Sequence, residues 1–213
     1  MRKDINMNIC LLGGTGRVGK HILKRAIADE HHVTALVRSS EKLTDVTSKY
    51  LTIIEGNVLN ESDIVKSIKG ADIVVSALGT DKNDTLSKSM PLIIKAMQQQ
   101  QISRIITIGT AGILDSRTQP ERYRFQSNES KRRITTAAED HLKAYKQLAA
   151  SDVSWTIVCP TYLPDEREIG KYRVEKNRLP EDGRKISVAD TAAFSYQQLF
   201  DDSYIHTRVG IAY

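Results

Sequence analysis

The stretch NICLLGGTGRVGKH at residues 8–21 decides the fold. A short apolar run enters a turn dense in glycine, and apolar residues then recur at helical spacing. Gly14, Gly16 and Gly19 satisfy the G-x-G-x-x-G spacing, while Gly13, Gly16 and Gly19 satisfy the looser G-x-x-G-x-x-G. Such glycines permit a sharp turn, a close approach of backbone N–H groups to a pyrophosphate, and tight packing of helix on strand. We therefore predict a strand–turn–helix unit that binds a dinucleotide at the helix N-terminus.

Length and composition indicate one globular domain over residues 1–213, with residues 1–6 as a flexible lead. No apolar run approaches the length needed to cross a bilayer, so no membrane association is expected. The net charge of +5 is spread along the chain and does not predict nucleic-acid binding. Cys10 and Cys159 lie in apolar runs without a C-x-x-C partner, which favours buried, reduced thiols and a cytoplasmic location.

Strand and helix patterns alternate along the chain without a break in composition. Apolar runs predict strands at residues 8–12, 32–37, 51–58, 71–79, 104–112, 153–160 and 206–211. Helical spacing predicts helices at residues 18–27, 60–70, 84–101, 135–150 and 187–200. This order predicts an α/β fold, a single-domain doubly wound Rossmann fold with a mainly parallel sheet and a small C-terminal extension on the substrate side.

The end of the second predicted strand bears on the choice of cofactor. An acid about 20 residues beyond the glycines binds the ribose 2′-OH of NAD, whereas an arginine there accommodates the 2′-phosphate of NADP. This position holds Arg38, followed by Ser39 and Ser40, with no acid before Glu41. We therefore predict a preference for NADP(H) over NAD(H). The alternative is a solvated arginine at a strand end.

Other candidate residues follow the predicted strands, because ligands of doubly wound sheets lie beyond the carboxyl ends of the strands. Asn57 and Val58 are candidates for the adenine end, although an ordinary turn asparagine is as plausible. Thr110 is placed to face a nicotinamide or a substrate, with a simple turn residue as the alternative. Backbone close to the middle of the cofactor is predicted at Ala77, Leu78 and Gly79.

Residues 113–133 form the longest irregular segment and are rich in arginine. With Tyr123 and Phe125, this basic loop is a candidate cover for an anionic aromatic substrate. A solvated basic loop is the alternative, because runs of charge usually face water.

The chain resembles the atypical short-chain dehydrogenases/reductases, in particular the NmrA-like group that includes NAD(P)H-dependent flavin reductases and biliverdin-IXβ reductase. Five stretches carry the resemblance in order: GGTGRVG at 13–19, LVR at 36–38, GNVL at 56–59, EDHLK at 139–143 leading to SWTIV at 154–158, and ISVAD at 186–190.

The resemblance implies a role for most of the candidate residues. The pyrophosphate would be held by Gly13, Thr15, Gly16, Arg17, Val18 and Gly19. Arg38 would hold the 2′-phosphate, and Thr110 takes the place of the family's Ser/Thr beside the nicotinamide. Asn57 stands where the family commonly has Asp. The substrate side would be lined by Pro160, Thr161 and Tyr162.

The Tyr-x-x-x-Lys pair of ordinary short-chain dehydrogenases is missing from the helix after the fifth predicted strand. Tyr145 and Lys146 are adjacent there, and the match at Tyr172 and Lys176 lies in a polar region beyond the sixth strand. On the helix, His141 is interpreted as a surface residue rather than a residue of the cleft. The histidines also lack the spacing of a metal site, so no metal is expected.

These observations favour an NADPH-dependent reductase that transfers hydride to a flavin or a similar planar acceptor, with Thr110 and Tyr162 at the site of reaction. One alternative is an NmrA-like redox sensor that binds NAD(P) without turnover. Another is an enzyme resembling nucleotide-sugar epimerases or dehydratases. A small aromatic or quinone-like molecule is the expected partner, and the chain is expected to be a monomer or a weak homodimer.

Overall fold

The computed structural model describes residues 6–80 and 83–213. The predicted lead therefore lies outside the described residues, apart from Asn6. One eight-stranded sheet has the order β3-β2-β1-β4-β5-β6-β8-β7. Its strands are β1 (Asn8–Leu12), β2 (His32–Val37), β3 (Leu51–Glu55), β4 (Ile73–Ser76), β5 (Arg104–Ile108), β6 (Ser154–Pro160), β7 (Arg173–Lys176) and β8 (Thr207–Ala212).

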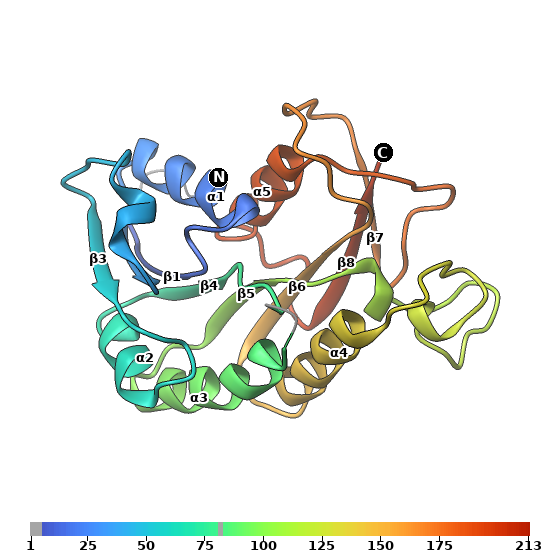
Figure 1. Cartoon of the computed structure of the whole chain (residues 1–213), viewed down its shortest axis with the longest axis horizontal. Coiled ribbons are helices and arrows are strands. Elements are labelled where there is room, and N and C mark those ends of the chain that lie inside the picture. Colours follow the sequence, from blue (N-terminus) through green and yellow to red (C-terminus); the bar gives the residue numbers. More distant parts are fainter. Residues whose placement is uncertain (1–5, 81–82) are drawn as a thin grey trace.

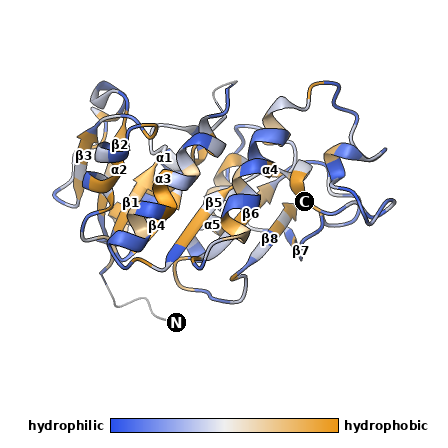
Figure 2. Cartoon of the chain, turned by 90° about the horizontal axis from the view of Figure 1, so that it is seen from below, coloured by the Kyte–Doolittle hydropathy of each residue, from blue (hydrophilic) through white to orange (hydrophobic). Residues whose placement is uncertain are grey.

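Helices cover both faces of the sheet (Figure 1). The face of α1 and α5 carries one hydrophobic core, and the face of α2, α3 and α4 carries the other. The helices are α1 (Arg17–Ala28), α2 (Glu61–Ile68), α3 (Thr85–Gln99), α4 (Thr136–Ala149) and α5 (Val188–Gln197), with short 3₁₀ turns η1 (Ser40–Leu43), η2 (Ala111–Ile113) and η3 (Arg124–Gln126). Figure 2 shows apolar strands at the centre and more polar helices outside, the pattern of a sheet that is buried on both faces.

The chain reverses its direction of strand addition beside β1, which lies between β2 and β4. Seven strands pair in parallel, and only β7 is antiparallel to its neighbour β8. The carboxyl ends of the parallel strands therefore meet along one edge of the sheet. In open α/β sheets, ligands bind in the crevice beyond this edge at the point of reversal.

The predicted doubly wound fold is confirmed, and most predicted elements lie where expected. Three differences have physical reasons. β7 was not predicted, because it is a half-buried edge strand without an apolar run. The predicted strands at 71–79 and 104–112 are shorter, since the backbone leaves the sheet after Ser76 and Ile108.

Two buried acids hold parts of the chain that are distant in sequence. Asp140 on α4 accepts hydrogen bonds from the backbone N–H groups of Leu86 and Ser87, each at 3.0 Å, and so caps α3 from a neighbouring helix. Asp190 on α5 accepts from the N–H groups of Ile169 (3.0 Å) and Gly170 (2.8 Å) and thereby fixes the loop before β7. Burial alone would raise the pKa of Asp190, but these hydrogen bonds, with those from Tyr213 and Ser187, hold it below its ordinary value.

His31 at the amino end of β2 gives the fold a pH dependence. Its side chain is buried against Tyr196 and Phe200, and Nδ1 accepts from the N–H of Met7 at 3.2 Å. Among the described residues, Nε2 has no hydrogen-bond partner. Burial lowers the pKa of this imidazole, against a weaker opposing effect of Asp29.

We expect the free energy of unfolding to fall as the pH drops below the ordinary histidine pKa of about 6.5, because the unfolded chain then binds a proton that folded His31 resists. His31→Asn, whose amide oxygen can replace Nδ1, should reduce this fall in chemical denaturation between pH 7 and 5. The matched comparison is His32→Asn, because His32 is the exposed neighbour in the sequence. An unchanged slope in the His31 variant would contradict the assignment.

Candidate functional site

The glycine turn between β1 and α1 leaves no room for side chains at two positions. Gly13 has φ = 82°, and a Cβ atom there would lie 2.6 Å from the carbonyl oxygen of Ala77, just beyond β4. A Cβ atom on Gly19 would collide with the carbonyl oxygen of Gly13. The turn, the start of α1 and the end of β4 are therefore in direct contact. This contact brings together two groups of predicted cofactor-binding residues, 13–19 and 77–79.

The N-terminus of α1 is suited to an anion. Its N-cap residue Gly16 offers no side-chain hydrogen bond, and the first turn of the helix contains no acid. The first N–H groups thus lack an intrahelical partner, and the positive end of the helix dipole is not neutralised. Beside this end lies a hollow of about 280 Å³ lined by Thr15, Gly16, Arg17, Lys20, His21, Lys24 and Asp165. Four of these side chains are basic or imidazole groups, which suits phosphate.

Arg17 links this end of α1 to the segment after β6. Its guanidinium donates to the carbonyl oxygen of Leu163 at 2.8 Å and lies 3.4 Å from the carboxylate of Asp165. The predicted phosphate-binding residue therefore also holds the segment that follows Tyr162. A sequence pattern could not show this contact, because the partners are about 146 residues apart.

The ribose end of the predicted site contains an acid that the sequence analysis missed. Arg38 is exposed just beyond β2, where it was expected. The hydroxyl of Ser40 donates to the carboxylate of Glu55 at 3.2 Å. Glu55 pairs with Val37 in the register of β2 and β3, so the neighbouring strand supplies this acid. The side chain of Asn57 accepts from the N–H of Leu59 at 2.9 Å and is engaged in its own turn.

On the acceptor side, candidate residues follow the neighbouring strands β5 and β6. Thr110 caps η2, and its hydroxyl oxygen accepts from the N–H of Gly112 at 3.3 Å, which leaves the hydroxyl proton available to a ligand. Pro160 is buried at the end of β6, whereas Tyr162 is 62% exposed. The paired strands thus place Thr110 and Tyr162 at the same edge of the sheet.

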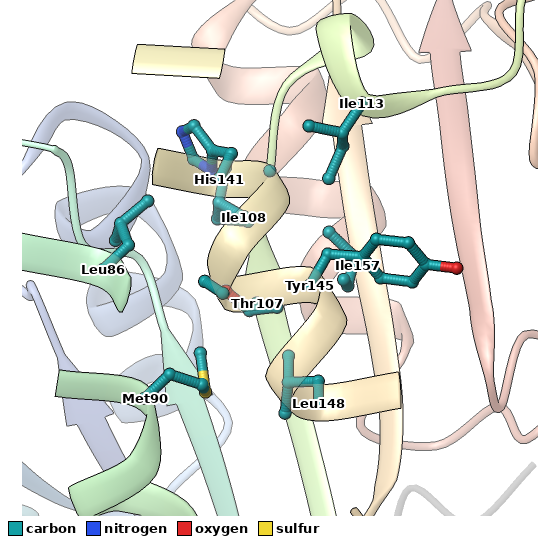
Figure 3. Close-up of a pocket in the computed structure, with 11 residues that line it drawn as sticks. Leu86, Met90, Thr107, Ile108, Ile113, His141, Tyr145, Leu148 and Ile157 are labelled. Atoms are coloured by element: carbon teal, nitrogen blue, oxygen red, sulfur yellow. The ribbon is translucent and has the colours of Figure 1, made fainter. Parts of the chain in front are cut away.

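His141 lines a small cavity between the sheet and helices α3 and α4. The cavity measures about 10 Å³, close to the volume for one water molecule, and its polar lining includes Thr107. Figure 3 shows the His141 imidazole beside Leu86 and Ile108, while the hydroxyl of Tyr145 points away from the cavity. Burial lowers the pKa of His141 to about 4, against a weaker opposing effect of Asp140. His141 is therefore neutral at pH 7. The interpretation of His141 as a surface residue was wrong, because its imidazole lines this cavity.

The arginine-rich segment after η2 is tied to the sheet by Arg208 of β8. This buried guanidinium donates to the carbonyl oxygen of Ile113 and pairs with Asp115 at 2.8 Å. It also lies 5.5 Å from the ring centroid of Tyr123 and 4.6 Å from that of Tyr145. Tyr123 is thus engaged in packing, which weakens its predicted role as part of a substrate cover.

Two alternative chemistries find no support in the part of the chain that the structure describes. Tyr172 and Lys176 lie before and on strand β7, so they do not share a helical face. Within residues 6–80 and 83–213, no three His, Cys, Asp or Glu side chains group as metal ligands. In the same ranges, no helix has the length and apolar character required to cross a membrane.

Comparisons with known proteins agree with this geometry. The family model for NAD(P)H-binding proteins matches residues 13–202. The uncharacterised protein YwnB of Bacillus subtilis is 26% identical over 178 residues, which cover 81% of each chain. The isoflavone reductase homolog A622 of Nicotiana tabacum is 33% identical over 79 residues, but this covers only 33% of the present chain and 26% of the relative.

Solved structures share the fold over nearly the whole chain. A candidate epimerase from Bacteroides thetaiotaomicron has a TM-score of 0.85 at 25% identity, with 98% of each chain covered. A candidate NADH-flavin reductase from Streptococcus pneumoniae has a TM-score of 0.80 at 24% identity, covering 97% of this chain and 99% of the other. These structures share the predicted fold, and the family match over residues 13–202 confirms the resemblance to NAD(P)H-binding proteins.

The collision at Gly19 can be tested directly. We expect Gly19→Ala to lower the free energy of unfolding by about 1–3 kcal/mol, the cost of overpacking a rigid site, and to abolish the thermal shift with NADPH. Gly79→Ala is the stability control, because a Cβ atom there meets no atom of the described residues within 4 Å. Wild-type stability and nucleotide binding in the Gly19 variant would refute the close contact of α1 with the turn.

Proposed function

We propose that this chain, which belongs to the NAD(P)H-binding family, is an NADPH-dependent reductase of a flavin or a similar planar acceptor. The cofactor assignment rests on the glycine turn. Gly13 and Gly19 have no side chains, so the backbone packs closely there, beside the N-terminus of α1, which has no side-chain cap. On the other side of the crevice, the absence of a Tyr-x-x-x-Lys pair from α4 favours an acceptor that needs no positioned proton donor.

The residues present fit a pyridine dinucleotide. Thr15, Gly16 and Arg17 line the basic hollow and would hold the diphosphate, together with Gly13, Val18 and Gly19. Arg38 would bind the 2′-phosphate, because a guanidinium forms strong charge-assisted hydrogen bonds with phosphate oxygens. The backbone of Ala77, Leu78 and Gly79 would pass beneath the middle of the cofactor, with Asn57 and Val58 near the adenine and Pro160 near the nicotinamide.

When bound, the reduced nicotinamide supplies a hydride to the acceptor. The proposed task of the protein is to orient the two rings and exclude water, with Thr110 donating a hydrogen bond and Tyr162 lining the acceptor side. Reduction of a ketone to an alcohol would need a positioned proton donor, and neutral His141 is a poor proton donor. Flavin or quinone reduction tolerates this lack, because the proton can come from water.

A redox sensor that binds the cofactor without turnover is the second candidate. One observation favours it: Tyr162, on the proposed acceptor side, is 62% exposed, so the described residues do not enclose a planar ring there. An acceptor would therefore have to bind in the more open part of the crevice, near exposed Tyr162. An epimerase-like reaction is disfavoured, because the helical Tyr-Lys pair is missing.

Turnover separates the candidates. We expect steady oxidation of NADPH, followed at 340 nm, when riboflavin phosphate is added to the protein. The rate constant kcat should stay flat between pH 6 and 8, because the pKa of His141 lies well below that range. Tight NADPH binding without turnover on flavins or quinones would instead identify a sensor. A bell-shaped pH profile would show that a protein side chain transfers the proton.

Arg38 is the test of cofactor choice. We expect Arg38→Ala to weaken NADPH binding by roughly 1.5–3 kcal/mol, the range for hydrogen bonds to charged groups, and to affect NADH much less. Isothermal titration calorimetry with both nucleotides measures the difference. Lys42→Ala removes an exposed positive charge from the same segment and serves as the control. Equal losses for NADPH and NADH in the Arg38 variant would reject the assignment.

A further inference from the structure

The carboxyl end of β3 brings an acid to the segment proposed to hold the cofactor's 2′ group. Glu55 is the last residue of β3 and pairs with Val37, the residue before Arg38. The N–H of Gly56 donates to the carbonyl oxygen of Val37 at 2.8 Å, which fixes the two strand ends side by side. The Glu55 carboxylate accepts from the hydroxyl of Ser40 at 3.2 Å. An acid thus lies beside the short segment of residues 38–40, which itself carries Arg38.

Glu55 makes few contacts that would stabilise the fold. Its side chain is exposed, and the described residues provide it with no ion pair. Nor does the Ser40 hydroxyl cap η1, whose N-cap residue is Ser39. Another acid near this edge, Asp63, is engaged as the acceptor of the Asn57 N–H at 2.9 Å. Glu55, in contrast, remains able to meet a ligand.

Carboxylates and arginines respond oppositely to the two cofactors. A free ribose 2′-OH can donate a hydrogen bond to a carboxylate, the interaction by which acids select NAD. A 2′-phosphate at pH 7 is mostly dianionic and repels a nearby carboxylate, while a guanidinium attracts it. Arg38 and Glu55 thus act in opposite directions on the same substituent.

We propose that Glu55 is a second determinant of cofactor specificity, which accepts a hydrogen bond from a ribose 2′-OH and opposes a 2′-phosphate. This inference rests on the proposed function. Its consequence is a moderate preference: Arg38 favours NADPH, Glu55 limits that advantage, and NADH remains a usable cofactor. Ser40, which is hydrogen-bonded to Glu55, can donate its hydroxyl to either the carboxylate or the phosphate.

The test compares wild-type protein with Glu55→Gln, which keeps the shape of the side chain and removes its charge. Calorimetric titrations use NADPH and NADH, and also 2′,5′-ADP and 5′-AMP, which differ only in the 2′-phosphate. We expect the variant to bind 2′,5′-ADP and NADPH about three- to tenfold more tightly, as relief of repulsion at a solvated site implies, and to bind 5′-AMP and NADH more weakly.

Glu41→Gln is the matched control, because Glu41 is an exposed acid directly after Ser40. It removes the same charge from the same neighbourhood without touching the Ser40–Glu55 pair. An equal gain of 2′,5′-ADP affinity in both variants would mean a general effect of net charge and would overturn the proposal. Thermal unfolding of each variant checks that the fold is retained.

Different results would refute the role of Glu55 and the proposed cofactor site. If wild-type protein binds both nucleotides and Glu55→Gln leaves the ratio of NADPH to NADH affinity unchanged, the role of Glu55 is refuted while the proposed cofactor site stands. If wild-type protein binds neither nucleotide nor either half-cofactor, the proposed function is refuted and the role of Glu55 with it.

Discussion

The close contact between α1 and the turn that precedes it is the constraint on which the site depends. A methyl group on Gly19 would collide with the carbonyl oxygen of Gly13, and Gly13 itself lies against Ala77 beyond β4. Because neither glycine has a side chain, backbone packs against backbone at these points. The N–H groups at the start of α1 therefore lie close to the edge of the sheet. Because the end of β4 belongs to the same contact, one packing arrangement fixes both the turn proposed to bind phosphate and the path proposed for the middle of the dinucleotide.

Buried acids stabilise other parts of the fold but are absent from the start of α1. Asp140 caps α3, and Asp190 binds the N–H groups of the loop before β7, so both carboxylates serve the architecture. The first turn of α1, in contrast, contains no acid and no side-chain cap. A carboxylate there would satisfy the helix end and also repel phosphate. Asp140 thus caps a helix and Asp190 fixes a loop, whereas the N-terminus of α1 carries no acid and is left to the proposed phosphate.

Sequence patterns predicted the parts of the structure that depend on local order. The strands β1, β2 and β6 are apolar runs, and the glycine spacing marks the turn, so these elements follow from the chain itself. Features that depend on strands or helices coming together did not follow. Glu55 reaches Ser40 through the register of β2 and β3. The lowered pKa of His141 results from packing among α3, α4 and β5, and β7 lacks an apolar run because it lies at an edge.

The double contact of Arg17 has a consequence for how the two halves of the crevice communicate. The guanidinium of Arg17, at the start of α1, donates to the carbonyl oxygen of Leu163 and lies beside Asp165. Both residues belong to the segment that leads away from Tyr162. A diphosphate arriving at α1 would draw on the same positive charge. Under the proposed function, nucleotide binding would therefore compete with Leu163 and Asp165 for Arg17 and so alter what anchors the segment that leads away from Tyr162.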